Sequence, residues 1–169
     1  MSESFVEFYA VHNISPVAQD ISDLEKHFQR RDSLFRALGL VPAFVSDRSV
    51  LEFGPGSGHN AIYMASLSPK RYDLVDGNPK GVAETRGRLE VFPGKKIEVH
   101  FALFEHFRAD TKFDLVWAEG CLPLQEQPLP LLKHMSSFVQ HGGVLCVSIN
   151  NGISYLSETI RRLFQRSVL

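Results

Sequence analysis

Short apolar runs alternate with longer amphipathic stretches through most of the chain. The runs are continuous rather than broken by a polar residue at every second position, which is typical of strands buried on both faces of a parallel sheet. The predicted strands are 49–53, 72–76, 97–101, 113–120 and 144–150. Helical spacing predicts helices over 59–68, 79–92, 128–141 and 153–169. This alternation predicts a doubly wound, Rossmann-like α/β fold, with helices on both faces of a mostly parallel sheet.

The residues ahead of the first predicted strand favour a helical extension. Ser15 is a plausible cap with Pro16 at the first helical position, and Ser22 with Glu25 forms a second start signal, a capping box. Gly39 predicts the end of this helix. Its expected apolar face consists of Ile21, Leu24, Phe28, Leu34, Phe35 and Leu38. We therefore expect one domain over 1–169, with a helical cap at 1–47 and a core at 48–169 that carries the ligand site.

Composition and charge exclude several classes of partner. The 169 residues suffice for one domain, and the net charge of −1 argues against nucleic acid or an anionic membrane surface as the main partner. No apolar run approaches the roughly 18–20 residues of a membrane span. Cys121 and Cys146 have no motif spacing, which predicts reduced thiols in a cytoplasmic protein. The seven histidines form no metal-ligand spacing, so no metal is expected.

The turn "EFGPGSG" at 52–58 follows the first predicted strand, where such folds bind ligands. Dinucleotide-binding proteins use a similar glycine turn, but three details differ. The third dinucleotide position would be His59, Pro55 removes an N–H from the loop, and Glu52 places a carboxylate two residues before the first glycine. A carboxylate there repels a pyrophosphate and suits a cation. The turn therefore favours a ligand with positive charge and no phosphate.

Asp76 ends the second predicted strand, in "LVDGNP". An acid at this position can accept both hydroxyls of a ribose. A ligand with a ribose diol and a cationic group is required, and S-adenosylmethionine, with its ammonium and sulfonium groups, meets both conditions.

Four segments in order, "VLEFGPGSG", "LVDGNP", "FDLVWAEG" and "GGVLCVSI", resemble the motifs of the class I S-adenosylmethionine-dependent methyltransferases. The resemblance runs from about residue 48 to 150 and implies a seven-stranded sheet. It assigns Glu52, Gly54, Gly56 and Gly58 to the methionine end of the cofactor, Asp76 to its ribose, and Gly77 and Asn78 to the flanks of its adenine.

The chain departs from the family after the third predicted strand. Members often carry an acid there that reaches the adenine amino group, and here Leu103 occupies that position. Glu105 is one substitute, and the backbone groups of Leu103 and Phe104 are the other. Glu119 faces the same cleft, as a cofactor contact, a substrate contact or a solvated loop acid.

Three further basic residues leave alternatives open. Arg30 and Arg31 could reach a substrate anion or the cofactor carboxylate, although a solvated helix face is favoured. His59 at a helix start is favoured as a surface residue over a catalytic one.

The resemblance implies a methyltransferase that acts on a small-molecule or peptidic acceptor. The Asn/Asp-Pro-Pro-aromatic run of many N-methyltransferases is absent, because the corresponding residues read "AEGCLP", and the sequence identifies no general base. We expect the acceptor wall to come from residues 1–20, where Tyr9 and His12 are candidates, and from the loop 119–128. The alternatives are a non-catalytic S-adenosylmethionine-binding or scaffold domain of a larger protein, and an enzyme similar to the aminopropyltransferases.

The family has two further strands after the helix that follows the fifth strand. The last residues here predict only a helix, so we expect five main parallel strands and an exposed edge at the fifth strand. The 144–150 run is apolar throughout, like a central strand, and has no charges that would protect an edge. We therefore expect either a piece of a longer protein, which is favoured, or a homodimer that covers the edge of the fifth strand.

Overall fold

A five-stranded sheet organises the residues that this computed structural model describes, which are 5–15, 19–149, Leu156 and Ile160. The strands are β1 (Ser49–Phe53), β2 (Arg71–Asp76), β3 (Ile97–Phe101), β4 (Phe113–Ala118) and β5 (Val139–Val147). They lie in the order β3-β2-β1-β4-β5, and every neighbouring pair is parallel. The order reverses between β1 and β4, so ligands are expected at the carboxyl ends of these two strands. The predicted doubly wound α/β fold is confirmed.

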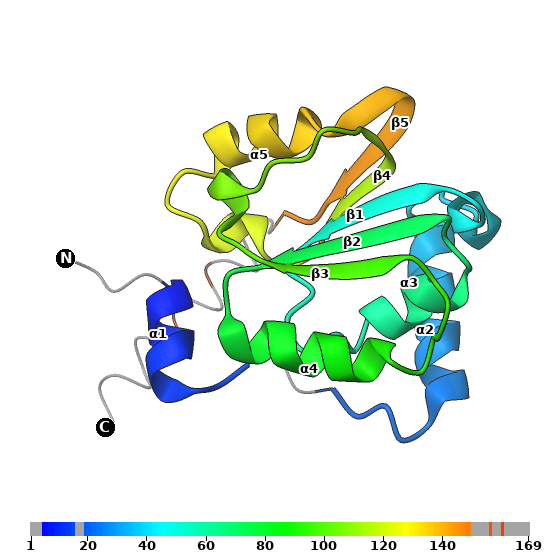
Figure 1. Cartoon of the computed structure of the whole chain (residues 1–169), viewed down its shortest axis with the longest axis horizontal. Coiled ribbons are helices and arrows are strands. Elements are labelled where there is room, and N and C mark those ends of the chain that lie inside the picture. The colour runs from blue at the N-terminus through cyan, green and yellow to red at the C-terminus, as the bar shows by residue number, and fades with distance from the viewer. Residues whose placement is uncertain (1–4, 16–18, 150–155, 157–159, 161–169) are drawn as a thin grey trace.

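Helices cover both faces of the sheet (Figure 1). One face carries α2 (Leu24–Ala37), α3 (Ala61–Ser66) and α4 (Pro79–Leu89), and the other carries α5 (Pro128–Ser136). Each face has its own apolar cluster, because alternate strand residues point to opposite sides. Phe35, Met64 and Leu74 belong to the first cluster, and Phe53 and Met135 belong to the second. This two-sided burial explains why the strands appear in the sequence as continuous apolar runs.

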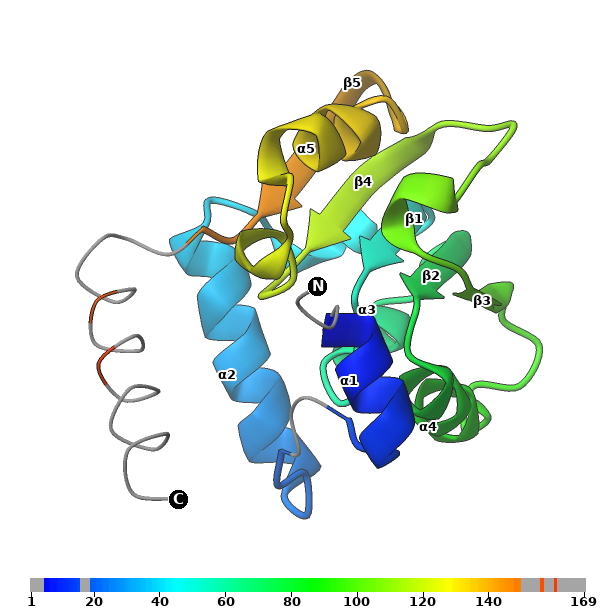
Figure 2. The same cartoon turned by 90° about the vertical axis from the view of Figure 1, so that its left-hand side faces the viewer.

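Short elements join these layers at the ends of the strands. They are α1 (Phe5–His12), η1 (Pro42–Val45), η2 (Phe104–His106) and η3 (Leu122–Leu124). Figure 2 looks at the carboxyl ends of the strands and shows α1 on this side of the molecule. The N-terminal helix is therefore close to the expected ligand site.

The long N-terminal helix begins later than the first start signal indicated. It starts at Leu24, and the Asp23 carboxylate accepts a hydrogen bond from the backbone N–H of Lys26 (2.9 Å), so the predicted Ser22 capping box is wrong by one residue. Pro16 lies outside the described residues. Leu24 and Leu38 are exposed, whereas His27, Arg31 and Phe35 are buried. The apolar face expected from hydrophobicity alone is therefore partly wrong, because two polar side chains find partners inside the protein.

The last described helix and strand also differ from their predicted bounds. Helix α5 ends at Ser136, and β5 begins at Val139 rather than at 144. Gly142, with φ +77°, lies in an irregular part of β5, where the pairing shifts from Phe113–Val139 to Leu115–Val144. The Gly142–Gly143 pair therefore lies inside the strand, and the helix ends five residues before the predicted end at 141.

The outer strand β5 is half-buried or exposed along its whole length. Its burial is that of an edge, so the predicted exposed edge of the fifth strand is confirmed. Whether more chain or a second copy covers this edge stays a prediction, and the predicted 153–169 helix lies outside the described residues except for Leu156 and Ile160. No helix in the described ranges is long and apolar enough to cross a bilayer.

Candidate cofactor site

The glycine turn between β1 and α3 requires glycine for both conformation and space. Gly54, Gly56 and Gly58 have φ of +72°, +59° and +79°, in the left-handed region that favours glycine. A Cβ on Gly54 would lie 2.8 Å from Cβ of Cys121, and one on Gly58 would lie 2.8 Å from Oγ1 of Thr85. The Thr85 hydroxyl also donates to the carbonyl of Gly56 (3.0 Å). The turn is thus held between α4 and the loop after β4.

Asp76 connects the end of β2 to this turn. Its Oδ2 accepts the N–H of Gly56 (3.1 Å), and its Oδ1 accepts the N–H of Asn78 (2.8 Å). Asp76 is 8% exposed, and burial raises its pKa while the two N–H donors act in the opposite direction. A carboxylate has about four acceptor positions, so each oxygen can accept a further hydrogen bond. This spare capacity fits a ribose diol, with one hydroxyl on each oxygen.

Glu52 has a different environment from the one that its position in the sequence suggested. It is 5% exposed on the sheet face covered by α2 and α3, and the hydroxyl of Tyr72 donates to its carboxylate. Burial raises the pKa of Glu52 to about 7, although Tyr72 and the positive charge of Arg31 act to lower it. Glu52 is therefore only partly ionised near neutral pH, which weakens the expectation of a fully charged carboxylate beside the turn.

A partly buried ion pair joins α2 to the residue that follows β4. Arg31 donates from Nη1 to Oε1 of Glu119 (2.9 Å) and from Nη2 to Oε2 (2.7 Å), and Trp117 Nε1 donates to the same Oε2 (3.2 Å). The Arg31 side chain is 9% exposed, so the favoured solvated position is wrong for Arg31 but holds for the exposed Arg30. Glu119 is not a freely solvated loop acid. A signal was present in the sequence, because Arg31 lies four residues before Phe35 on the buried stripe of α2.

The residues assigned to the adenine are brought together at the ends of β2 and β3. A Cβ on Gly77 would lie 3.0 Å from Cδ2 of Leu103 and 3.3 Å from Cγ1 of Val6, on α1. The rings of Phe104 and Phe53 are in edge contact, with centroids 5.6 Å apart. Leu103 is 37% exposed and Glu105 is also exposed. The juxtaposition of Val6 with Gly77 was not anticipated from the sequence.

Asn78 ties the N-terminal segment to this wall. Its Oδ1 accepts the N–H of Lys80 (3.1 Å) and caps α4, while its Nδ2 donates to the carbonyl of Ile14 (3.0 Å). The ammonium of Lys80 donates to the carbonyl of Asn13 (2.7 Å). Two hydrogen bonds from the start of α4 thus hold the chain just after α1.

His59 is 6% exposed, so its expected surface position is wrong. Its carbonyl is hydrogen-bonded to Nε2 of His27 (2.9 Å), and its own Nε2 lies 2.9 Å from Nη2 of Arg88. An arginine only donates, so Nε2 of His59 accepts, and burial together with Arg88 lowers the pKa of His59. The hydrogen bond between the His59 ring and Arg88 thus links the end of the glycine turn to α4.

Three other side chains considered from the sequence are Cys121, His12 and Tyr9. Cys121 donates to the carbonyl of Phe53 (3.4 Å), and burial raises the pKa of its thiol to about 12, which suits packing rather than nucleophilic attack. Of the candidate acceptor-wall residues, His12 is exposed on α1 with its ring 4.4 Å from that of Phe8, and Tyr9 is partly buried on the same helix.

Comparison with known proteins agrees with this geometry. A family model described as a methyltransferase domain matches residues 24–166. The chain belongs to this family, within the class I S-adenosylmethionine-dependent methyltransferases. A relative in Phocaeicola vulgatus, a tRNA1(Val) (adenine(37)-N6)-methyltransferase, is 32% identical over 80 residues, which are 47% of this chain and 34% of that protein. The match thus spans about a third of the relative's length.

Solved methyltransferases share the fold. The N-methyltransferase NodS from Bradyrhizobium japonicum WM9, in complex with S-adenosyl-L-homocysteine, has a TM-score of 0.59 at 20% identity, over 75% of this chain and 63% of its own. Magnesium protoporphyrin IX methyltransferase from Synechocystis PCC 6803, with bound S-adenosylmethionine, has a TM-score of 0.60 at 19% identity, over 80% and 67% of the two chains. At these sequence identities, the similarity to the two solved structures shows a shared fold.

Proposed function

We propose that the chain binds S-adenosylmethionine at the carboxyl ends of β1, β2 and β4 and transfers its methyl group to a small-molecule or peptidic acceptor. When bound, this cofactor supplies an electrophilic methyl group on a sulfonium. The observation that carries the proposal is the Asp76 carboxylate, which is fixed by the N–H groups of Gly56 and Asn78 and still has acceptor capacity. Family membership supports the same conclusion.

The proposed roles follow from where each group lies. Asp76 accepts the ribose hydroxyls, and the turn at 54–58 lets the backbone approach the methionine part without an intervening Cβ. The adenine lies near Gly77 and Asn78, against Leu103 and Phe104. Glu52 and Glu119, together with Arg31, set the charge at the methionine end.

The acceptor class is proposed from the chemistry of methyl transfer, the residues at 118–123 and the net charge of the chain. Displacement at a sulfonium methyl mainly requires alignment of the reacting atoms, and a base is needed only when the acceptor must lose a proton. Residues 118–123, "AEGCLP", lack the Asn/Asp-Pro-Pro-aromatic run of many N-methyltransferases. The net charge of −1 also gives little support for a nucleic acid acceptor. The tRNA substrate in the name of the Phocaeicola relative belongs to that protein, of which only 34% is matched.

The proposed acceptor wall is formed by α1 and the loop after β4. Helix α1 stands at the carboxyl ends of the strands (Figure 2), with Tyr9 and His12 on it. In the loop 119–128, Cys121 packs against the glycine turn, because a Cβ on Gly54 would lie 2.8 Å from Cβ of Cys121. Both segments border the end of the sheet where the methyl group would lie.

The test combines binding with turnover. Calorimetry should show binding of S-adenosylmethionine and S-adenosylhomocysteine, and incubation with cofactor labelled on the methyl group should transfer label to a pool of small metabolites or peptides. Binding of neither compound at millimolar concentration would overturn the proposal. Binding without transfer to any pool would favour a non-catalytic domain, and transfer to RNA alone would overturn the acceptor class.

A further inference from the structure

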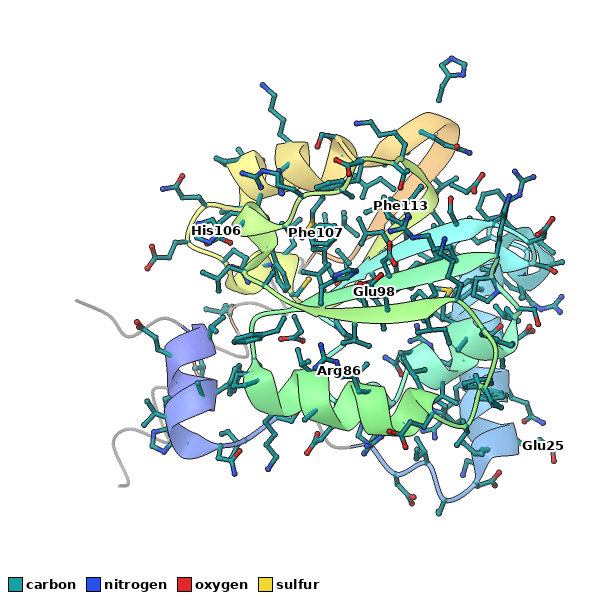
Figure 3. All side chains as sticks on the ribbon, viewed as in Figure 1. Glu25, Arg86, Glu98, His106, Phe107 and Phe113 are labelled. Atoms are coloured by element: carbon teal, nitrogen blue, oxygen red, sulfur yellow. The ribbon has the colours of Figure 1, made fainter. Side chains whose placement is uncertain are left out.

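Three potential metal ligands meet on the side of the sheet opposite α4. Asp73 on β2 is the registered neighbour of Glu98 on β3, and His100 follows two residues later on the same strand face. Figure 3 shows Glu98 on the side that carries Phe107 and Phe113, whereas Arg86 of α4 lies on the other side. Asp73 and Asp76 are three residues apart on one strand, so they face opposite sides of the sheet. The cluster is therefore separate from the cofactor site.

The charges in this cluster are not fully balanced. Like charges on registered strand neighbours destabilise a sheet unless a cation compensates them. Asp73 is 1% exposed, and its Oδ2 is ion-paired with Nη2 of Arg71 at 2.5 Å. The Arg71 guanidinium faces two carboxylates, so it does not by itself balance their charge. A further cation is electrostatically favourable at this position.

Three buried atoms of Asp73 and His100 have no hydrogen-bond partner, namely both carboxylate oxygens of Asp73 and Nε2 of His100. Oδ2 of Asp73 is ion-paired with Arg71, whereas Oδ1 and Nε2 of His100 lie 3.7 Å apart. This separation is too long for a hydrogen bond. An ion about 2.0–2.2 Å from each atom, the usual range for zinc, bridges such a gap. A single ion at this position would coordinate both Oδ1 of Asp73 and Nε2 of His100.

Glu98 completes a set of three. One ligand atom from each of Asp73, Glu98 and His100 can be chosen so that all lie within 4.8 Å of one another. The side-chain exposures are 1% for Asp73, 25% for His100 and 65% for Glu98, so the cluster opens toward solvent on the Glu98 side. An ion can enter there and keep water in its remaining coordination position.

We propose that Asp73, Glu98 and His100 bind a divalent transition-metal ion of the zinc type. The imidazole nitrogen favours such an ion over Mg²⁺ or Ca²⁺, which prefer all-oxygen sites. The ion links β2 to β3 through side chains of both strands, so its role is structural. The site does not depend on the proposed methyltransferase function.

The test is titration of Zn²⁺ into the full chain, freed of any tag and pretreated with a chelator. One ion should bind per chain, and at a free concentration about 100 times Kd it should raise the melting temperature by about 5–10 °C. Glu98→Gln and His100→Gln should each weaken binding by at least about tenfold. The matched control is His106→Ala, an exposed histidine on η2, which should bind zinc like the wild type.

Loss of metal binding can be distinguished from loss of the fold. The decisive variants change partly exposed side chains, and their circular dichroism can be checked without metal. Asp73→Asn is a secondary variant, since it also disturbs the pair with Arg71. Absence of stoichiometric binding at about 100 μM Zn²⁺ would overturn the proposal. Binding that persists undiminished in both Glu98→Gln and His100→Gln would overturn it equally. S-adenosylmethionine affinity, measured in parallel, reports on the other site.

Discussion

At the scale of single residues, Glu52 shows how burial changes the chemistry of a carboxyl group. The side chain is enclosed between the sheet and its helices, with the hydroxyl of Tyr72 as its hydrogen-bond donor. Burial raises its pKa from 4.5 to about 7. The folded protein thus holds this proton more tightly than the unfolded chain. The resulting stabilisation is present below about pH 4.5 and is lost as the pH rises through about 7.

Glu52→Gln should remove this pH dependence while it keeps an acceptor for Tyr72. We expect wild type and variant to be similarly stable near pH 5, and the variant to gain up to about 3 kcal/mol relative to wild type by about pH 8. Urea unfolding across this pH range measures the difference. The raised pKa of Asp76 is common to both proteins, so it cancels in the comparison. A difference that stays constant with pH would contradict the expectation.

At the scale of elements, α4 carries two glycines with opposite roles. Gly81 is buried, and a Cβ there would lie 2.7 Å from the carbonyl oxygen of Gly56. Gly87 is exposed in the same helix, and a Cβ there would meet nothing within 4 Å. The first glycine permits close packing of the helix on the turn, and the second has no such function in the structure.

Alanine substitution at these two positions should change stability in opposite directions. Gly81→Ala should destabilise the fold by about 1–3 kcal/mol through overpacking, and should also weaken cofactor binding because Gly56 donates to Asp76. Gly87→Ala should stabilise it by about 0.5–1 kcal/mol, since alanine restricts the unfolded chain. Equilibrium unfolding in urea provides both values. Equal effects of the two substitutions would show that α4 does not pack on the turn in this way.

The sequence predicted the elements better than their ends. The strands β1 and β3 have the predicted bounds. Strand β1 is buried almost throughout, whereas β3 is an edge strand in which Glu98 and His100 alternate with apolar residues. The start of α2 was misplaced, because Ser22, Asp23 and Glu25 all carry capping side chains and only the backbone geometry selects Asp23. Residues 139–143 were missed as strand, since His141 and two glycines in an irregular pairing leave no apolar pattern.

At the scale of the whole molecule, the N-terminal segment is fastened across the carboxyl ends of the strands. Asn78 and Lys80 each donate one hydrogen bond to a carbonyl in residues 13–14. Val6 lies over Gly77. These contacts place α1 where it can border both the cofactor and the acceptor.

Loss of the two donors should loosen α1 without unfolding the core. Asn78→Ser keeps a capping oxygen but loses the amide donor, and Lys80→Met removes the ammonium. We expect amide exchange of residues 5–15 to be about fivefold faster in each variant and faster still in the double variant, at about 1 kcal/mol per hydrogen bond. Hydrogen exchange with mass spectrometry resolves the segment, and the surface variant Lys70→Met is the control. Unchanged exchange in the double variant would show that other contacts hold α1.

Local motifs and long-range contacts differ in how much of the site they reveal. The turn at 52–58 and Asp76 are contiguous signals, so the sequence pointed directly to the end of the sheet where we propose that the cofactor binds. The Arg31–Glu119 pair spans 88 residues, and no local pattern matches the two partners. Asp73 and His100 likewise become neighbours only through β-sheet register. The division into a 1–47 cap and a 48–169 core stays a prediction.

The central claim is that Asp76 binds the ribose of S-adenosylmethionine, and calorimetric titration of wild type and Asp76→Ala tests it most directly. The exposed loop acid Asp110, changed to alanine, serves as the matched control for loss of one negative charge. We expect wild type and Asp110→Ala to bind alike, and folded Asp76→Ala to lose about 1.5–3 kcal/mol, which is about a 10- to 150-fold weaker affinity. Affinity of Asp76→Ala within about twofold of wild type, or no binding by the wild type, would contradict the claim.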